Sequence, residues 1–194
     1  QFSLVGPMPV MAPRTMMMTP GSHTNLTSSY SSSRRTHHAQ GRHLGRSSFF
    51  RPSKALATGH EAEIHATVDV PLGDRTYPIY VGTNLLLSQT WTKHVKGKSA
   101  IVVTNETIAP LWLDQCVAAL EEAGKDVATA ILPDGEEFKT LETMNLIFDE
   151  ALKKRLDRKT TMVALGGGVI GDVTGFAASC YQRGVEFVQV LTTT

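Results

Sequence analysis

The spacing of hydrophobic residues divides this chain into two parts that meet near residue 60. Residues 1–60 show neither helical nor strand periodicity, and they contain few large apolar side chains. Between residues 64 and 70, in contrast, apolar and polar residues alternate, which is typical of a half-buried strand. A turn over residues 71–74 and a second strand over residues 77–81 complete a predicted β-hairpin.

Strands and helices alternate over the rest of the chain. A continuous apolar run predicts a strand buried on both faces over residues 100–103, and further strands are predicted over residues 127–132, 161–165 and 185–191. Helical spacing predicts a helix from Pro110 that Gly124 stops, a second over residues 141–152, a third over 173–181 and a short one within 85–95. This order predicts a parallel α/β sheet, whose ligands bind beyond the carboxyl ends of the strands.

The charge of the front part changes this picture. No Asp or Glu precedes Glu61, whereas seven Lys and Arg residues do, and the segment is rich in Ser and Thr. Without the apolar core of a secretory signal, this composition is typical of an organelle transit peptide, and the Ser and Thr content favours the chloroplast. Gln1 in place of Met suggests that the true start is missing. A disordered tail and a basic patch for nucleic acid are the alternatives, but the charges are scattered and lack interleaved aromatic residues.

The cysteines exclude a disulfide framework. Cys116 and Cys180 are the two cysteines of the chain, and neither lies at a metal-ligand spacing. Both fall on apolar faces of predicted helices, so we expect two buried thiols in a reducing compartment. No stretch of the sequence is long and apolar enough to predict a membrane span.

The strongest chemical signal is the glycine-rich stretch after the third predicted parallel strand. Gly166-Gly167-Gly168-Val169-Ile170-Gly171 satisfies G-x-G-x-x-G between a strand and a helix. Backbone without Cβ atoms can approach an anion closely, and a helix start directs free N–H groups at a phosphate. We therefore expect nucleotide binding, with a tight packing turn as the alternative. Asp172 is either an acid favoured by the helix dipole or an acceptor for a ribose hydroxyl.

Polar residues at the other strand ends complete the predicted cleft. Within Asp134-Gly135-Glu136-Glu137-Phe138-Lys139, Glu136 could accept from a ribose diol and Lys139 could approach a phosphate. The alternative is a solvated helix start that Thr140 caps. Thr192 and Thr193 offer hydroxyls at the end of the last strand, where threonine is also common for its strand propensity.

One arginine and two histidines are weaker candidates for a functional role. Arg183 follows a predicted helix, where a cation is favoured by the dipole, and its alternative role is to bind an anionic substrate. His65 and His94 lack the neighbours that a metal site requires.

Four blocks of this sequence together resemble 3-dehydroquinate synthase. They are Val103-Thr104-Asn105-Glu106-Thr107-Ile108-Ala109-Pro110-Leu111, Leu132-Pro133-Asp134-Gly135-Glu136-Glu137-Phe138-Lys139, residues 164–172 and Tyr181-Gln182-Arg183-Gly184-Val185. With its front tail, the chain resembles the plant chloroplast form. The resemblance implies a disordered transit peptide over residues 1–60 and an NAD-binding domain over residues 61–194. That domain would be a Rossmann-like parallel sheet with an N-terminal hairpin, and the family's helical metal-binding domain would be absent from this chain.

The resemblance also implies an activity. Members of this family cyclise 3-deoxy-D-arabino-heptulosonate 7-phosphate to 3-dehydroquinate in the shikimate pathway, with release of phosphate. NAD takes a hydride and returns it, and a zinc or cobalt ion acts as a Lewis acid. Because the metal ligands and most catalytic residues of the family lie in the helical domain, we expect neither in this chain, and no turnover from it alone. Another sugar-phosphate cyclase, a metal-dependent polyol dehydrogenase and a non-catalytic NAD-binding fragment are the alternatives.

Residue by residue, the resemblance implies a cofactor site and one substrate contact. The NAD contacts would be Asn105, Asp134, Gly135, Glu136, Lys139, Gly167, Gly168, Val169, Gly171, Asp172, Thr192 and Thr193. Arg183 matches an arginine that reaches the substrate phosphate in the partner subunit, which implies a homodimer. Nucleic acid and membranes are not expected partners. The chain departs from the family at Leu191, where members usually have Pro, and at Thr194, where they have an apolar residue.

Overall fold

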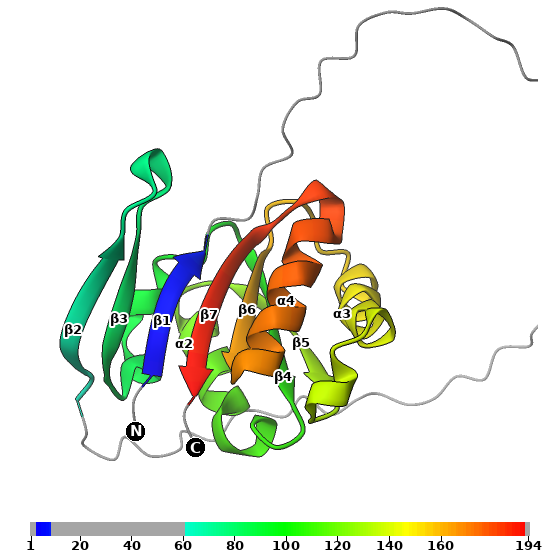
Figure 1. The fold of residues 1–194 in the computed structure, drawn as a ribbon, viewed down its shortest axis with the longest axis horizontal. Helices are drawn as coiled ribbons and strands as arrows, with labels where there is room; N and C mark the ends of the chain where they lie inside the picture. Colours follow the sequence, from blue (N-terminus) through cyan, green and yellow to red (C-terminus); the bar gives the residue numbers. More distant parts are fainter. Residues whose placement is uncertain (1–2, 9–60, 193–194) are drawn as a thin grey trace, which may run out of the picture. The chain divides into compact units, whose positions relative to one another are not determined.

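The computed structural model of this protein describes residues 61–192 and the backbone of residues 3–8. These residues form one sheet of seven strands in the order β2-β3-β1-β7-β6-β4-β5 (Figure 1). The strands are β1 (Ser3–Met8), β2 (Glu63–Val70), β3 (Tyr77–Thr83), β4 (Ser99–Asn105), β5 (Asp126–Leu132), β6 (Thr161–Gly166) and β7 (Glu186–Thr192). The helices are α1 (Gln89–Thr92), α2 (Asp114–Glu122), α3 (Leu141–Lys153) and α4 (Gly168–Cys180).

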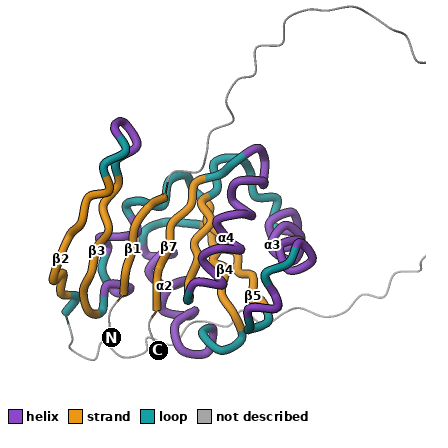
Figure 2. Tube along the Cα trace, viewed as in Figure 1, coloured by secondary structure: helices purple, strands orange, loops and turns teal. Residues whose placement is uncertain are grey.

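Four of the strands make the predicted parallel sheet. β7, β6, β4 and β5 lie side by side in parallel pairs, each joined to the next in the chain by a helical connection. A π-helical turn, Ala109–Leu113, precedes α2, and Pro110 stands in its first turn. α3 and α4 cover one face of the sheet and α2 covers the other, as Figure 2 shows by element type. The predicted α/β fold is therefore confirmed.

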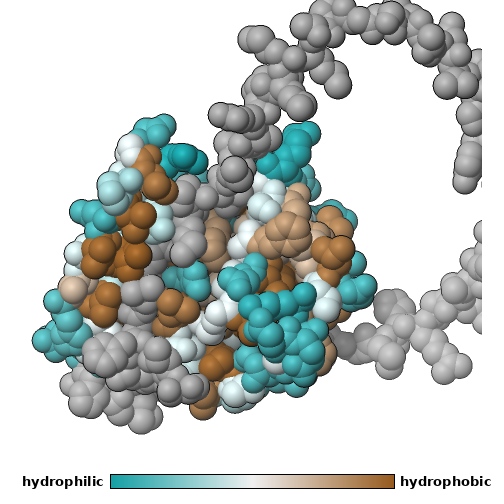
Figure 3. Space-filling model, viewed as in Figure 1, coloured by the Kyte–Doolittle hydropathy of each residue, from teal (hydrophilic) through white to brown (hydrophobic). Residues whose placement is uncertain are grey.

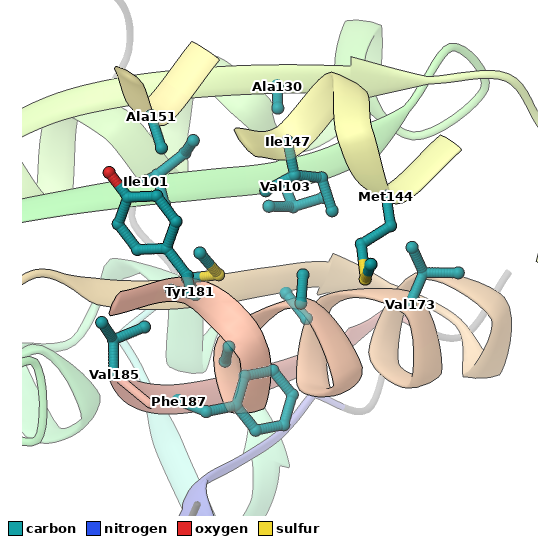
Figure 4. Packing of buried hydrophobic residues seen from close by; sticks show 14 of the residues in the cluster. Ile101, Val103, Ala130, Met144, Ile147, Ala151, Val173, Tyr181, Val185 and Phe187 are labelled. Carbon is teal, nitrogen blue, oxygen red and sulfur yellow. The ribbon is translucent and has the colours of Figure 1, made fainter. Parts of the chain in front are cut away.

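The alternation of side chains along the buried strands divides the core between these two faces. Ile101 and Val103 of β4 pack against α3 and α4, together with Ile147 and Val173 (Figure 4). The intervening residues of β4 belong to the opposite cluster, which includes the fully buried Trp91. A strand buried on both faces explains why the sequence reads here as a continuous apolar run.

The other three strands form the antiparallel part of the sheet. β2 and β3 make the predicted hairpin, and β1 lies antiparallel between β3 and β7. β1 falls within the segment predicted as a disordered transit peptide, so the structure departs from that prediction at residues 3–8. This strand occupies the edge of β7 that would otherwise offer unpaired N–H and C=O groups. Residues 9–60 lie outside the described residues, and the transit peptide stays a prediction.

Several predicted helix boundaries need correction. The helix expected within residues 85–95 is split into a 3₁₀ turn, Leu85–Leu87, and the short α1, because Ser88 between them is extended. α4 begins at Gly168, five residues before the predicted start. In α3, Leu141 and Leu152 have the helical spacing of the buried Met144 and Ile147, which predicts one apolar face, yet both leucines are exposed.

The two cysteines have different surroundings. Cys116 of α2 is fully buried, as expected, and burial raises the pKa of its thiol to about 12. The expectation of a second buried thiol is wrong, because Cys180 is exposed. It lies on the outer side of the last turn of α4, whose inner side carries Ala177 and Ala178. Among the described residues, no helix is long and apolar enough to cross a membrane.

Candidate functional site

The carboxyl ends of the four parallel strands meet at one edge of the sheet. In the strand register, Asn105 at the end of β4 lies opposite Leu132 at the end of β5, and Gly166 of β6 lies opposite Leu191 of β7. The connections that leave these ends carry most of the predicted site residues. Figure 3 shows a patch of hydrophilic side chains over the starts of α3 and α4, at this same edge.

Two glycines in the turn between β6 and α4 border open space that the described residues do not fill. Gly166 needs to lack a side chain, because its φ is 157° and a Cβ there would lie 3.1 Å from the side chain of Ile170. Gly167 and Gly168 are exposed, and no described heavy atom lies within 4 Å of the position that a Cβ would take on either one. Neither residue has a positive φ. Their lack of side chains therefore serves no packing or conformational need within the described chain.

The start of α4 is also without a side-chain cap. Gly167 is its N-cap residue and offers no acceptor, so the first N–H groups of the helix lack the partner that a capping side chain supplies. Val169 follows in the first turn and is half-buried. Free N–H groups at the positive end of a helix dipole, with open space before them, form a site for an anion such as a phosphate.

Gly171, the last glycine of the motif, lies in different surroundings. It is buried in α4, and a Cβ there would lie 2.3 Å from the side-chain nitrogen of Gln189 on β7. That nitrogen is the end of a flexible side chain, which can move to admit a Cβ. The cofactor contact predicted for Gly171 therefore stays a prediction.

Lys139 joins the two helix starts. Its Nζ lies 2.7 Å from Oε1 of Glu136, on its own loop, and 3.0 Å from Oδ2 of Asp172 in α4. Hydrogen bonds to Glu136 and then to Asp172 raise the pKa of Lys139. The Lys139 side chain is 31% exposed and that of Asp172 70% exposed, so both remain accessible to a ligand. The structure thus brings together three predicted site residues around the open turn.

Asn105 and Asp134 form a second group at the same edge, but they bind each other. Nδ2 of Asn105 donates to Oδ1 of Asp134 at 2.7 Å, and Oδ1 of Asn105 accepts from the backbone N–H of Ile108 at 2.8 Å. Thr107 donates its hydroxyl to Oδ2 of Asp134 at 2.7 Å. Asn105 is only 6% exposed. The predicted cofactor contacts Asn105 and Asp134 are therefore engaged within the chain, and Gly135 follows them with a φ of 137°.

Thr192 is the last residue of β7 at this edge, and its hydroxyl is a buried polar group. Its Oγ1 is buried and has no hydrogen-bond partner among the described residues. It lines a small pocket on the α2 side of the sheet, together with Asn84, Trp112 and Gln115. Thr193 lies outside the described residues, so its predicted role stays untested.

Comparison with known proteins identifies what this edge resembles. Residues 129–194 match the family model described as 3-dehydroquinate synthase N-terminal. Over 128 residues the chain is 56% identical to the 3-dehydroquinate synthase of Pseudomonas aeruginosa (strain LESB58), an alignment that covers 66% of the chain and 34% of the relative. The chain thus spans about a third of the length of this curated relative.

Solved structures share the fold. A crystal structure of 2-deoxy-scyllo-inosose synthase is 25% identical, with a TM-score of 0.57 over 66% of this chain and 36% of that one. Another structure of 2-deoxy-scyllo-inosose synthase, complexed with carbaglucose-6-phosphate, NAD+ and Co2+, is 23% identical with a TM-score of 0.54, and the match covers 63% of this chain and 34% of that one. The second likeness extends to the fold alone.

Arg183 lies far from the group just described. It follows the last turn of α4 and precedes β7, so it stands at the amino edge of the parallel strands, a helix length away from the glycine turn. Gln182 and Arg183 both have positive φ values, 51° and 68°, which non-glycine residues rarely adopt. Such backbone strain is concentrated at functional positions. The structure does not bring Arg183 to the site of its own chain.

No metal site is found in the described part of the chain, where no group of three or more His, Cys, Asp and Glu residues could hold an ion. His94 instead hydrogen-bonds the hydroxyl of Tyr80 at 3.2 Å, and burial followed by the charges of Lys93 and Lys96 lowers its pKa. The sequence analysis missed Thr107 as a residue of the site. The signal was its position two residues after Asn105, at the end of a buried strand.

Proposed function

We propose that this chain is the NAD-binding part of a 3-dehydroquinate synthase, an enzyme that cyclises 3-deoxy-D-arabino-heptulosonate 7-phosphate to 3-dehydroquinate and releases phosphate. The observation that carries the proposal is the 56% identity to a 3-dehydroquinate synthase over 128 residues. The matched residues include both helix starts at the carboxyl edge, since the family model covers residues 129–194. The chain spans about a third of that relative, so the reaction of the whole enzyme belongs to this proposal.

The residues at the carboxyl edge fit NAD. The open space at Gly167 and Gly168 and the uncapped first turn of α4 suit a pyrophosphate. Lys139 supplies a cation beside it, and Asp172 or Glu136 can accept hydrogen bonds from ribose hydroxyls. When bound, NAD supplies the hydride chemistry of the reaction. The part of this chain is to hold and orient the cofactor, and one solved structure of the same fold contains NAD+.

The described residues do not fit the zinc or cobalt ion that such an enzyme uses, since no suitable group of ligands is found among them. We therefore assign the metal ligands to the part of the enzyme outside this chain, and we derive no step through the metal here. Arg183 stands at the opposite edge from the glycine turn. We propose that it binds the substrate phosphate of a partner subunit in a homodimer of the full-length enzyme.

Binding of NAD to this chain tests the first part of the proposal. We expect isothermal titration calorimetry to show one NAD site per chain, weakened by Asp172→Ala and unchanged by Asp126→Ala at the amino edge of the sheet. No heat of binding with a folded chain would contradict the proposal. For the whole enzyme, the full-length gene product should release phosphate from the seven-carbon substrate, and Arg183→Ala should abolish this release without loss of NAD binding.

A second sugar-phosphate cyclase is the alternative that an observation favours, because 2-deoxy-scyllo-inosose synthase shares the fold at a TM-score of 0.57. The identity of 25% to that protein is less than half of that to the 3-dehydroquinate synthase. An assay of the full-length enzyme with both phosphorylated sugars separates the two. Turnover of a hexose 6-phosphate in place of the seven-carbon acid would support the alternative.

We also propose that the protein is the plant chloroplast type and that residues 1–60 direct its import into the plastid stroma. The support is compositional, since this segment contains seven basic and no acidic residues. A fluorescent protein fused behind residues 1–60 should accumulate in plastids of leaf cells. The same fusion with its arginines replaced by glutamate should stay in the cytosol, and plastid import of that variant would contradict the proposal.

A further inference from the structure

The carboxylate of Asp134 is held at both oxygens by side chains of the neighbouring strand end. Oδ1 accepts from Asn105 at 2.7 Å and Oδ2 accepts from Thr107 at 2.7 Å. Both donors come from the β4 side, whereas Asp134 lies in the loop that follows β5. Hydrogen bonds to an ionised acceptor are stronger than those between neutral groups. The two loops are therefore linked at this point by a pair of charge-assisted bonds.

The donor side of this link is itself fixed. Asn105 is 6% exposed, and its Oδ1 accepts from the backbone N–H of Ile108 at 2.8 Å, which sets the orientation of its amide group. The backbone N–H of Glu106 donates to the carbonyl of Leu132 at 3.1 Å and continues the strand pairing into the two loops. Asn105 thus stands on the buried end of the sheet, Thr107 follows it at the surface, and Asp134 is the group that is held.

The loop held in this way has few other restraints before α3 begins. Gly135 has a φ of 137°, and the single 3₁₀ turn Glu136–Phe138 that follows has no side-chain cap. Yet this loop carries Glu136 and Lys139, and Lys139 reaches across to Asp172 at 3.0 Å. The position of Lys139 relative to the glycine turn depends on where the loop leaves β5, and that is the point where Asp134 is anchored.

We propose that Thr107 and Asn105 are positioning residues, which hold the Asp134 carboxylate and through it set the loop that presents Glu136 and Lys139 to the anion site of α4. The consequence for the cofactor rests on the proposed function. Asn105 and Asp134 then act through the loop that they fix, and Thr107 joins them in this role. The hydroxyl of Thr107 is the part of this clamp that can be removed with the least change in shape.

Thr107→Val removes the hydroxyl and keeps the branched shape, whereas Thr107→Ser keeps the hydroxyl. The matched control is Thr129→Val on the exposed side of β5, since Thr129 makes no side-chain hydrogen bond among the described residues. The readout is hydrogen–deuterium exchange of the ligand-free chain at the amides of Phe138 and Lys139, which donate within the 3₁₀ turn at 3.2 and 3.1 Å. We expect exchange about tenfold faster in Thr107→Val, the scale of one lost hydrogen bond. Thr107→Ser, Thr129→Val and the amides of β6 should be unaffected.

Binding of NAD to the same variants supplies the second readout. We expect Thr107→Val to weaken it by about fivefold, and Thr107→Ser to restore it. Unchanged exchange in Thr107→Val, or equal acceleration in Thr129→Val, would overturn the positioning role. A third outcome separates the two proposals. If exchange responds as expected but neither the unaltered chain nor any variant binds NAD, the positioning role is supported and the proposed function is contradicted.

Discussion

Helices α3 and α4 begin next to each other at the carboxyl edge of the sheet, and their first turns are built in opposite ways. At α3 the side chain of Thr140 accepts from the backbone N–H of Thr143 at 3.2 Å, so the helix caps itself. At α4 the N-cap is Gly167, which has no side chain to do so, and the space around Gly167 and Gly168 is open. One start is complete within the chain, and the other leaves donors for a partner.

This difference decides between two candidates that look alike in the sequence. Both connections contain glycine and acidic residues after a parallel strand, and each could be taken for a phosphate site. The N–H groups of a helix start need acceptors, and a capped helix has less to offer an anion. We therefore expect the phosphates of the proposed cofactor at α4, with the loop before α3 contributing side chains from beside it.

The largest expected effect comes from filling the open space at α4. In Gly168→Ala, the new Cβ meets no described atom within 4 Å and suits a helical residue, so thermal stability should be unchanged or slightly higher. The same Cβ would stand where the pyrophosphate approaches. We expect NAD affinity to fall about 100-fold, or ~2.7 kcal/mol, by calorimetry.

Gly175→Ala is the matched control for this change. It makes the same substitution in the same helix, and its Cβ would be in ordinary contact, 3.4 Å from the ring of Phe187. NAD affinity should therefore be retained. A loss of affinity in both variants would show that the effect is transmitted by the packing of α4, and the open turn would not be the phosphate site.

The second effect concerns the acid that follows the glycines. Asp172→Ala removes an acceptor that we assign to a ribose hydroxyl, and NAD binding should weaken by about 1–3 kcal/mol. Inorganic pyrophosphate has no ribose, and the same change frees Lys139 from one of its two carboxylates. The affinity for pyrophosphate should therefore stay the same or rise. Equal weakening of both ligands in calorimetry would contradict the assignment to ribose.

The third effect should fall on stability and spare binding. Thr140→Ala removes the cap of α3, and such a loss costs ~1 kcal/mol of the free energy of unfolding. Urea unfolding measures this cost, and Thr140→Ser should recover it because serine keeps the hydroxyl. NAD affinity should change by less than about twofold, since we assign the cofactor phosphates to the start of α4 and not to that of α3. A large loss of NAD affinity would remove the distinction between the two helix starts.

The sequence predicts the parallel sheet well, because strands buried on both faces leave continuous apolar runs and their helices show a clear period. It fails where tertiary contacts decide. Cys180 has the spacing of a core residue, yet it lies on the outer side of the last turn of α4 and is exposed. Strand β1 has six residues and no periodicity, and its place depends on the free edges of β3 and β7.

In the candidate site, too, the roles of single residues depend on tertiary contacts that the sequence does not show. The glycine motif locates the site, but its four glycines serve different ends, which the pattern alone cannot separate. Gly167 and Gly168 leave open space, whereas Gly171 faces the side chain of Gln189, a residue eighteen positions later in the sequence. Asn105 and Asp134 bind each other across two loops, and Thr107 enters through that contact. Partners of this kind become visible only when the strands are in register.

The smallest expected effect concerns the link between the two helix starts. Hydrogen bonds to Glu136 and Asp172 raise the pKa of Lys139, so its contribution to stability is fully present below the pKa of an unfolded lysine, about 10.4, and is lost as pH rises through the higher folded value. Because exposed ion pairs contribute little, we expect Lys139→Met to lower the thermal midpoint slightly at pH 8 and to reduce its further fall between pH 10 and 12.

Lys153→Met is the control, because the pKa of Lys153 is also raised, by Glu150 and to a smaller extent by Asp149, which both lie in α3. Both variants should show the same small change in the pH dependence of stability. Pyrophosphate binding separates them, since it should weaken only in Lys139→Met. If neither variant alters it, Lys139 only ties the two loops together, and the anion would be held by the backbone of α4 without help from the loop before α3.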